Sequence, residues 1–72
     1  MEAAQQFAEN LAIFRQRAGL TQEELAFQAS THPTWISHLE SGRLNPRLDT
    51  ITRLAAALET KPADLLTGIG SQ

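Results

Sequence analysis

The chain has 72 residues, no cysteine and a formal net charge of −2 at pH 7. A chain of this length forms one small domain, in which only about 60% of the surface of the unfolded chain becomes buried. The absence of cysteine excludes a disulfide framework. We expect a cytoplasmic protein, because the sequence shows neither a signal peptide nor an apolar run of the roughly 18 residues that a membrane span needs.

The net acidity argues against a nucleic-acid partner, but the distribution of charge softens that argument. The basic residues of the middle of the chain are Arg15, Arg17, Arg43, Arg47 and Arg53, whereas acidic residues such as Glu2 and Asp64 lie towards the ends. A local basic surface can bind phosphate although the whole molecule is acidic. The low total charge should nevertheless limit non-specific affinity for DNA.

The first predicted helix covers residues 3–18. Phe7, Leu11 and Phe14 recur at spacings of four and three, which places them on one side of a helix, and Gly19 ends it. This apolar side is typical of a helix that packs on a core.

Residues 20–42 predict two short helices joined by a tight turn, at about 22–29 and 33–41. Thr21 and Glu24 form a capping box at the start of the first. Pro33 suits the first position of the second helix, and Gly42 suits its end. Ser30 stands where the turn needs a left-handed backbone, at a cost of about 1 kcal/mol.

Two further helices are predicted at about 48–58 and 62–66. In the first, an inward stripe is expected from Leu48, Ile51, Leu54, Ala55 and Leu58. Arg47 and Lys61 precede the two helices at positions where a Ser or Thr cap is common, so both starts should be weakly capped. Residues 68–72 are expected to be a frayed tail. The predicted fold class is all-α.

The order of these motifs resembles a known family. GLTQEELA at 19–26, Trp35-Ile36-Ser37, Leu39-Glu40, Gly42, Asn45-Pro46 and the helix LDTITRLAAALE at 48–59 together resemble the Cro/C1-type (XRE) helix-turn-helix family, which includes the lambdoid phage repressors. The resemblance implies a single compact five-helix domain over residues 1–72, with its core at 7–66 and the helix-turn-helix at the second and third helices.

The resemblance also implies the DNA-contacting residues. In a helix-turn-helix the second helix of the motif enters the major groove, while the first helix crosses the backbone. The candidates for DNA contact are Gln22, Pro33, Thr34, Trp35, Ser37, His38, Arg43 and Arg47. For Gln22 and the two arginines the alternative is an ordinary solvated side chain. Pro33 cannot make a bidentate base contact, so we expect DNA shape and bridging water to contribute to recognition.

Two residues admit a second interpretation. The family pairs an arginine at the position of Arg15 with the glutamate that ends the reading helix, here Glu40; the alternative is a solvated arginine. Trp35 fits the inward side of its helix poorly, because Ile36 and Leu39 already define that side. It lies either along the sugar-phosphate edge of DNA or half-buried against the second helix or the following loop.

An enzyme is not expected. His32 and His38 are six residues apart and cannot share a metal as an i, i+4 pair does. The sequence indicates no cofactor, no metal and no small-molecule ligand, and the chain is too short to enclose a pocket of a few hundred Å³.

We therefore expect a transcriptional regulator that binds double-stranded DNA in a sequence-specific way, as a homodimer on a pseudopalindromic operator. Leu66 and Ile69 are the candidate apolar contacts between the two copies; the alternative is end-of-chain packing. The competing hypothesis is a protein-interaction module, such as an antitoxin, controller or adaptor subunit, with weak DNA binding.

Overall fold

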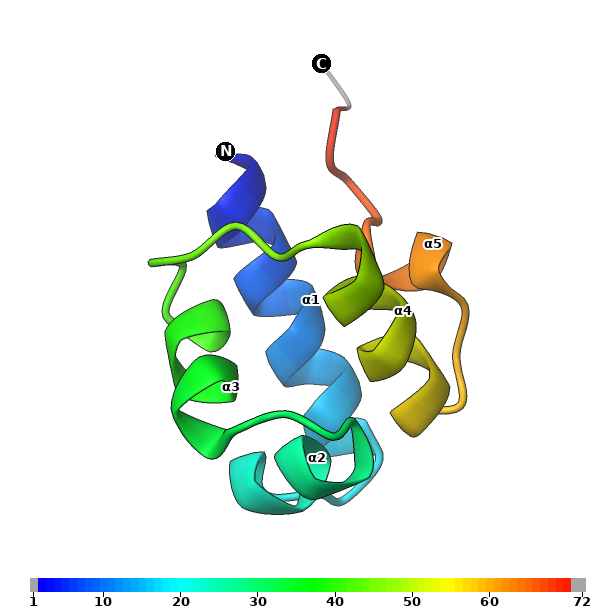
Figure 1. The fold of residues 1–72 in the computed structure, drawn as a ribbon. Coiled ribbons are helices and arrows are strands. Elements are labelled where there is room, and N and C mark those ends of the chain that lie inside the picture. The colour runs from blue at the N-terminus through cyan, green and yellow to red at the C-terminus, as the bar shows by residue number, and fades with distance from the viewer. Residues whose placement is uncertain (1, 71–72) are drawn as a thin grey trace.

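The computed structural model describes residues 2–70, which form five helices and no strand. The helices are α1 (Ala3–Arg17), α2 (Gln22–Gln28), α3 (Pro33–Glu40), α4 (Leu48–Ala57) and α5 (Pro62–Leu65) (Figure 1). The predicted all-α class is therefore confirmed. Each helix begins at the predicted residue and ends one residue earlier than predicted, because the last predicted residue is in every case the C-cap. Residue 1 and residues 71–72 of the predicted domain and tail lie outside the described residues.

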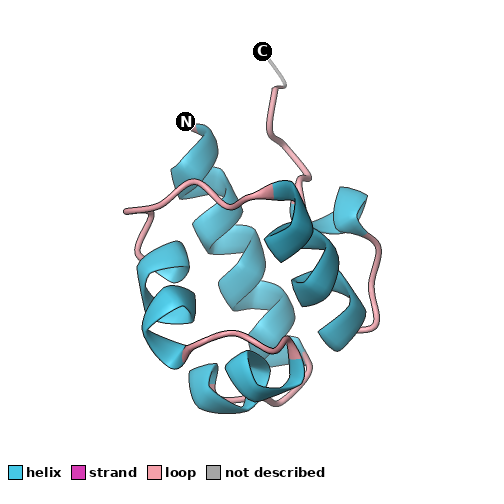
Figure 2. Cartoon of the chain, viewed as in Figure 1, coloured by secondary structure: helices cyan, strands magenta, loops and turns pink. Residues whose placement is uncertain are grey.

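The helices are arranged around α1, which runs through the middle of the molecule (Figure 1). Helix α3 lies on one side of α1, α4 and α5 lie on the other, and α2 closes the lower end of the view. The segments between helices are short loops and turns (Figure 2). Within residues 2–70 no helix is long and apolar enough to cross a membrane.

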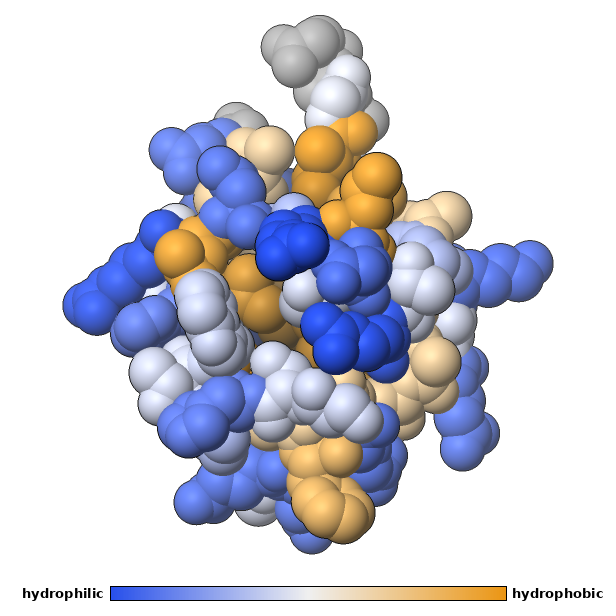
Figure 3. Space-filling model, in the orientation of Figure 1, coloured by the Kyte–Doolittle hydropathy of each residue, from blue (hydrophilic) through white to orange (hydrophobic). Residues whose placement is uncertain are grey.

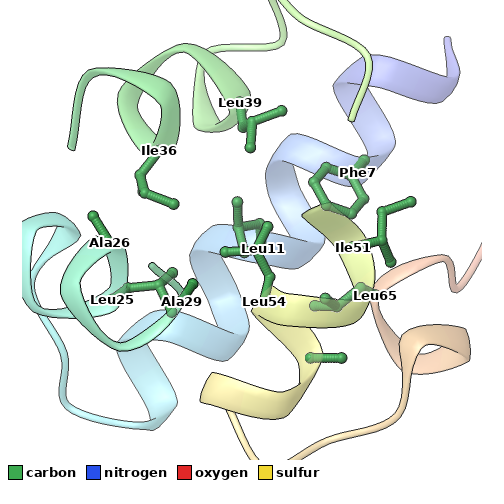
Figure 4. Packing of buried hydrophobic residues seen from close by; sticks show 11 residues of the cluster. Phe7, Leu11, Leu25, Ala26, Ala29, Ile36, Leu39, Ile51, Leu54 and Leu65 are labelled. Carbon is green, nitrogen blue, oxygen red and sulfur yellow. The ribbon is translucent and has the colours of Figure 1, made fainter. Parts of the chain in front are cut away.

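The hydrophobic core takes side chains from all five helices (Figure 4). Its buried members are Phe7, Leu11, Leu25, Ala26, Ala29, Ile36, Leu39, Ile51, Leu54, Ala55 and Leu65. Phe14 and Leu58 are partly buried and pack against this cluster. The apolar stripes predicted for α1, α3 and most of α4 are therefore confirmed.

Leu48 is the exception, because 82% of it is exposed. Its predicted inward position is wrong. Leu48 is the first residue of α4 and lies at the edge of the stripe that Ile51 and Leu54 define. Its side chain consequently projects past the end of the core and adds an apolar group to the surface.

The buried polar residue Asn10 fastens the C-terminal part of the chain to α1. Its Nδ2 donates to the carbonyl oxygens of Leu65 and Thr67, at 2.9 Å each, and its Oδ1 accepts from Gln6 Nε2 at 3.1 Å. Beyond these contacts Ile69 packs against the core. The expectation of a frayed tail is thus wrong for the stretch up to Ile69, because a buried amide and an apolar side chain hold it.

The starts of α4 and α5 differ in how their backbone amides are satisfied. Arg47 provides no side-chain cap for α4, as predicted. At α5, Asp64 compensates for the missing cap, since its Oδ2 accepts from the backbone N–H of Lys61 at 3.0 Å and from the hydroxyl of Thr60. The hydrogen bond from Thr60, followed by that from Lys61, lowers the pKa of Asp64 below its usual value.

Candidate nucleic-acid interface

Hydrogen bonds fix both ends of α2 and the turn that leads from α2 into α3. The predicted capping box is present, since Thr21 Oγ1 accepts from the amide of Glu24 at 3.0 Å and Glu24 Oε1 accepts from the amide of Thr21 at 2.8 Å. Ser30 has φ = 55°, the left-handed conformation that the sequence predicted. The amide of Thr31 then donates back to Ala26 at 2.9 Å and closes the end of α2.

The start of α3 is fixed by an N-cap that the sequence did not reveal. His32 Nδ1 accepts from the amide of Thr34 at 3.1 Å, and Pro33 occupies the first helical position. Histidine is an uncommon cap, so residue preference alone gives no signal for it. The end of α3 is fixed as predicted, because Gly42 follows with φ = 79°. This left-handed backbone is open to glycine and strained for a residue with a side chain, which explains the glycine at this position.

The outer side of α3 is polar and accessible. Thr34 and Ser37 are exposed, and Pro33 and His38 are partly exposed. On the opposite side Ile36 and Leu39 are buried in the core. The structure therefore brings four of the predicted DNA-contacting residues onto one side of one helix.

A buried ion pair locks the last turn of α3 to α1. Arg15 Nε donates to Glu40 Oε2 at 2.6 Å and Arg15 Nη2 donates to Glu40 Oε1 at 3.0 Å, while Arg15 Nη1 donates to the carbonyl of Leu20 at 2.8 Å. The two side chains are only 14% and 8% exposed. The hydrogen bond to Glu40 raises the pKa of Arg15. The predicted pair thus exists with bidentate geometry, the strongest form of such a contact.

Gln22 joins this ion pair at the start of α2. Its Nε2 donates to Glu40 Oε1 at 3.1 Å, a contact that the sequence analysis did not anticipate. Since a glutamine amide carries two N–H groups, this bond uses only part of its donor capacity. Glu40 therefore holds α1, α2 and α3 in one arrangement.

Trp35 lies beside a hollow next to α3. The residue is 54% exposed, so it is neither a core residue nor fully solvated. The hollow has a volume of ≈ 260 Å³, and its lining comes from the turn before α3, from α3, from the following loop and from α4: Thr31, Trp35, Leu39, Leu44, Asn45, Pro46, Arg47, Thr50 and Arg53. This position fits both interpretations left open by the sequence, because the ring borders the loop and about half of its surface stays exposed.

The loop after α3 carries the two predicted arginines. Arg43 and Arg47 are both exposed. Arg47 Nε lies 3.5 Å from Asp49 Oδ1. A third arginine, Arg53 of α4, lies 3.7 Å from Asp49 Oδ2 and donates to the carbonyl of Ser30 at 3.4 Å. Basic side chains therefore border the hollow, which gives this side of the molecule the local positive charge expected of a phosphate-binding surface.

The two residues predicted to contact a second copy, Leu66 and Ile69, differ in their exposure. Leu66 is exposed, whereas Ile69 is partly buried and packs against the core of its own chain. Figure 3 shows hydrophobic surface gathered near the C-terminal end of the chain, next to strongly hydrophilic residues. Leu48 adds an exposed leucine at the start of α4.

Phe27 is an exposed apolar residue that the sequence analysis did not single out. It is 85% exposed on α2. The signal was present, because Leu25, Ala26 and Ala29 define the buried side of that helix and a helical period places Phe27 outside it.

Within residues 2–70 no group of three His, Asp or Glu side chains could hold a metal ion.

Comparison with known proteins agrees with this geometry. A family model described as a helix-turn-helix domain matches residues 6–67. The control protein C.BamHI of Bacillus amyloliquefaciens is 42% identical over 57 residues, which cover 76% of this chain and 70% of that protein. The control protein C.SmaI of Serratia marcescens is 37% identical over 70 residues, which cover 97% and 83% of the two chains.

A solved structure gives the same result. The restriction-modification controller protein C.AhdI from Aeromonas hydrophila matches with a TM-score of 0.84 and 34% identity, over 86% of this chain and 94% of that one. The chain therefore belongs to the Cro/C1-type (XRE) helix-turn-helix family of DNA-binding transcription regulators.

Proposed function

We propose that the chain is a sequence-specific transcription regulator that places α3 in the major groove of double-stranded DNA and acts as a homodimer on a pseudopalindromic operator. The observation that carries this proposal is the geometry of α3. Its inner residues are buried, its start is capped by His32, its end is fixed by Glu40, and its outer side chains are polar. Its task is recognition rather than catalysis, in the cytoplasm where DNA is available.

Base recognition is assigned to Thr34, Ser37 and His38. Hydroxyl groups donate or accept at base edges, and the threonine methyl can contact a thymine methyl. Pro33 offers no side-chain hydrogen bond. Discrimination at its position then relies on fit and on the shape of the DNA.

Backbone contacts are assigned to Gln22, Arg43 and Arg47, with the Trp35 indole N–H as a further donor. Phosphate contacts fix the register of the protein on the duplex but carry no sequence information. The second amide N–H of Gln22 serves this role while the first donates to Glu40. Arg43 and Arg47 reach the backbone from the exposed loop.

The second copy is proposed to pair through α5 and the start of α4, with Leu66 and Leu48 at the contact and Ile69 supporting it from inside. Both leucines are exposed. A helix-turn-helix dimer places its two reading helices at half-sites about 34 Å apart, one turn of DNA, and doubles the number of contacts. Pairing would also remove the exposed leucines from water.

A titration of fluorescence-labelled DNA tests the proposal. The protein is added to a random-sequence duplex pool at about 50 mM and 200 mM salt, and the bound duplexes are then selected and sequenced. Binding should weaken steeply with salt, because phosphate contacts release counterions. Thr34→Ala combined with Ser37→Ala should change the selected sequence, while Arg43→Gln should weaken binding to all duplexes alike.

A second function, a protein-interaction module in the manner of a controller, antitoxin or adaptor subunit, is favoured by the net charge of −2 and by Pro33 in the reading helix. The similarity to C.BamHI, C.SmaI and C.AhdI favours the controller role, but a controller also binds DNA and differs from the proposed function in biological role rather than in chemistry. The salt dependence separates DNA recognition from a module that contacts only protein. If no duplex binds even at low salt, DNA recognition is the wrong assignment and a protein partner should be sought.

A further inference from the structure

The first turn of α4 places one carboxylate between two arginines. Asp49 Oδ1 lies 3.5 Å from Arg47 Nε, and Asp49 Oδ2 lies 3.7 Å from Arg53 Nη2. Arg47 precedes the aspartate by two residues and Arg53 follows it by one helical turn. A single acidic side chain therefore faces the basic groups that border the hollow beside α3.

The ion pairs of Asp49 with Arg47 and Arg53 are weak and can open. Both distances exceed those of charge-assisted hydrogen bonds, which are about 2.7–2.9 Å. The side chains of Arg47 and Asp49 are 84% and 59% exposed, so water screens their attraction. The contrast with Arg15 and Glu40, which lie 2.6 Å apart and are nearly buried, is clear. One pair holds the fold together, and the other can open without disturbing the core.

A phosphate group offers Arg47 the same chemistry as the carboxylate. Both are anionic oxygen acceptors that a guanidinium can bind with two parallel N–H groups. Arg47 cannot direct the same donors at Asp49 and at a phosphate. When Arg47 moves to the DNA, the negative charge of Asp49 remains near the backbone and repels it.

We propose that Asp49, held in place by Arg53, competes with the DNA backbone phosphate for Arg47. This competition limits the affinity of the chain for DNA. The inference rests on the proposed DNA-binding function. It assigns the low affinity expected from net acidity to one residue rather than to the overall charge.

The test compares Asp49→Asn with Glu9→Gln, which removes the same charge from an exposed position on α1 that does not border the hollow. Dissociation constants are measured by fluorescence anisotropy on one selected duplex at several salt concentrations. Asp49→Asn should tighten binding about two- to fivefold at low salt, with a smaller gain as salt rises. Glu9→Gln should change the dissociation constant by less than about twofold.

Combination with Arg47→Gln shows where the gain arises. In that background Asp49→Asn should give a clearly smaller gain than in the wild type, because no arginine is left for Asp49 and the phosphate to share and only the repulsion between Asp49 and the backbone is relieved. Thermal unfolding of each variant, followed by circular dichroism, confirms that binding is measured on folded protein.

The outcomes are distinct. If wild type binds DNA and Asp49→Asn matches Glu9→Gln or binds more weakly, Asp49 is not a competitor and the inference is overturned while the proposed function stands. A gain of undiminished size in the Arg47→Gln background overturns it as well. If no variant binds any duplex, the proposed function fails and the inference falls with it.

Discussion

Replacement of Arg15 with methionine should destabilise the protein far more than a surface substitution does. Arg15 donates two hydrogen bonds to Glu40 and one to the carbonyl of Leu20. The substitution leaves the Glu40 carboxylate, 8% exposed, with Gln22 as its remaining donor. The carboxylate then has little access to water and a neutral donor in place of the cation.

The size of the effect follows from the burial of the pair. Removal of one partner of a buried ion pair costs about 3–5 kcal/mol. Because Arg15 keeps 14% of its side chain exposed, we expect the lower end of that range, about 3 kcal/mol. In a domain of this size each kcal/mol lowers the melting temperature by about 4–8 °C, so the total fall is roughly 12–24 °C.

Thermal unfolding followed by circular dichroism, together with urea unfolding followed by Trp35 emission, measures this cost. Arg17→Met is the matched control on the same helix. Arg17 is exposed, and its guanidinium carbon lies 5.8 Å from the centroid of the Phe14 ring. Its removal should cost less than about 1 kcal/mol.

The double variant Arg15→Met with Glu40→Leu separates pairing from packing. Two apolar side chains of similar volume in place of a buried pair are often neutral for stability. We therefore expect the double variant to regain most of the stability that Arg15→Met loses. A loss of under 1 kcal/mol for Arg15→Met, or a double variant as unstable as the sum of both single changes, would refute the reasoning.

Three further predictions concern the backbone and the helix starts. Asn10→Ala should cost about 1–3 kcal/mol in urea unfolding, since a buried hydrogen bond to the Leu65 carbonyl and a partly buried one to the Thr67 carbonyl are lost; an unchanged midpoint would show that water replaces the amide. Ser30→Gly should raise the free energy of unfolding by about 0.5–1 kcal/mol, because glycine adopts positive φ without a Cβ penalty; a lower value would show that the serine conformation is not strained. The pKa of Asp64 is lowered in the folded state, so its stabilising effect is present above the ordinary value of 3.8 and is lost as pH falls through the folded pKa. Asp64→Asn should accordingly lower the melting temperature at pH 7 but not at the acid end, whereas a difference independent of pH would contradict this linkage.

Most of the helical framework was predictable because it depends on local signals. The Thr21–Glu24 capping box, Pro33 and Gly42 each mark a helix boundary by their own chemistry, and each acts as predicted. The ion pair of Arg15 with Glu40 was implied by family resemblance, since the two residues are 25 positions apart in sequence. No local rule would have joined them.

Two residues have environments that local sequence signals could not give. Leu48 belongs to the apolar period of α4 but lies where the core stops, so periodicity alone could not place it. Asn10 sits between Phe7 and Leu11 on the inner side of α1, where an apolar residue would be expected. Only the carbonyls of Leu65 and Thr67, more than 50 residues away in sequence, explain its burial. The assignment of DNA-contacting residues stays a prediction.

If the proposed dimer forms, the amide of Asn10 bears on the operator that it selects. Helix α5 has four residues and is too short to hold a position by itself. Besides the burial of Leu65 in the core, its placement depends on α1 through the side chain of Asn10. In a dimer that pairs through α5, this side chain would set the angle between the two copies and hence the gap that they tolerate between half-sites. The base preference of the protein and the spacing that it tolerates between half-sites would then depend on different residues. A substitution at residue 10 could change the spacing while every residue that faces a base stays the same.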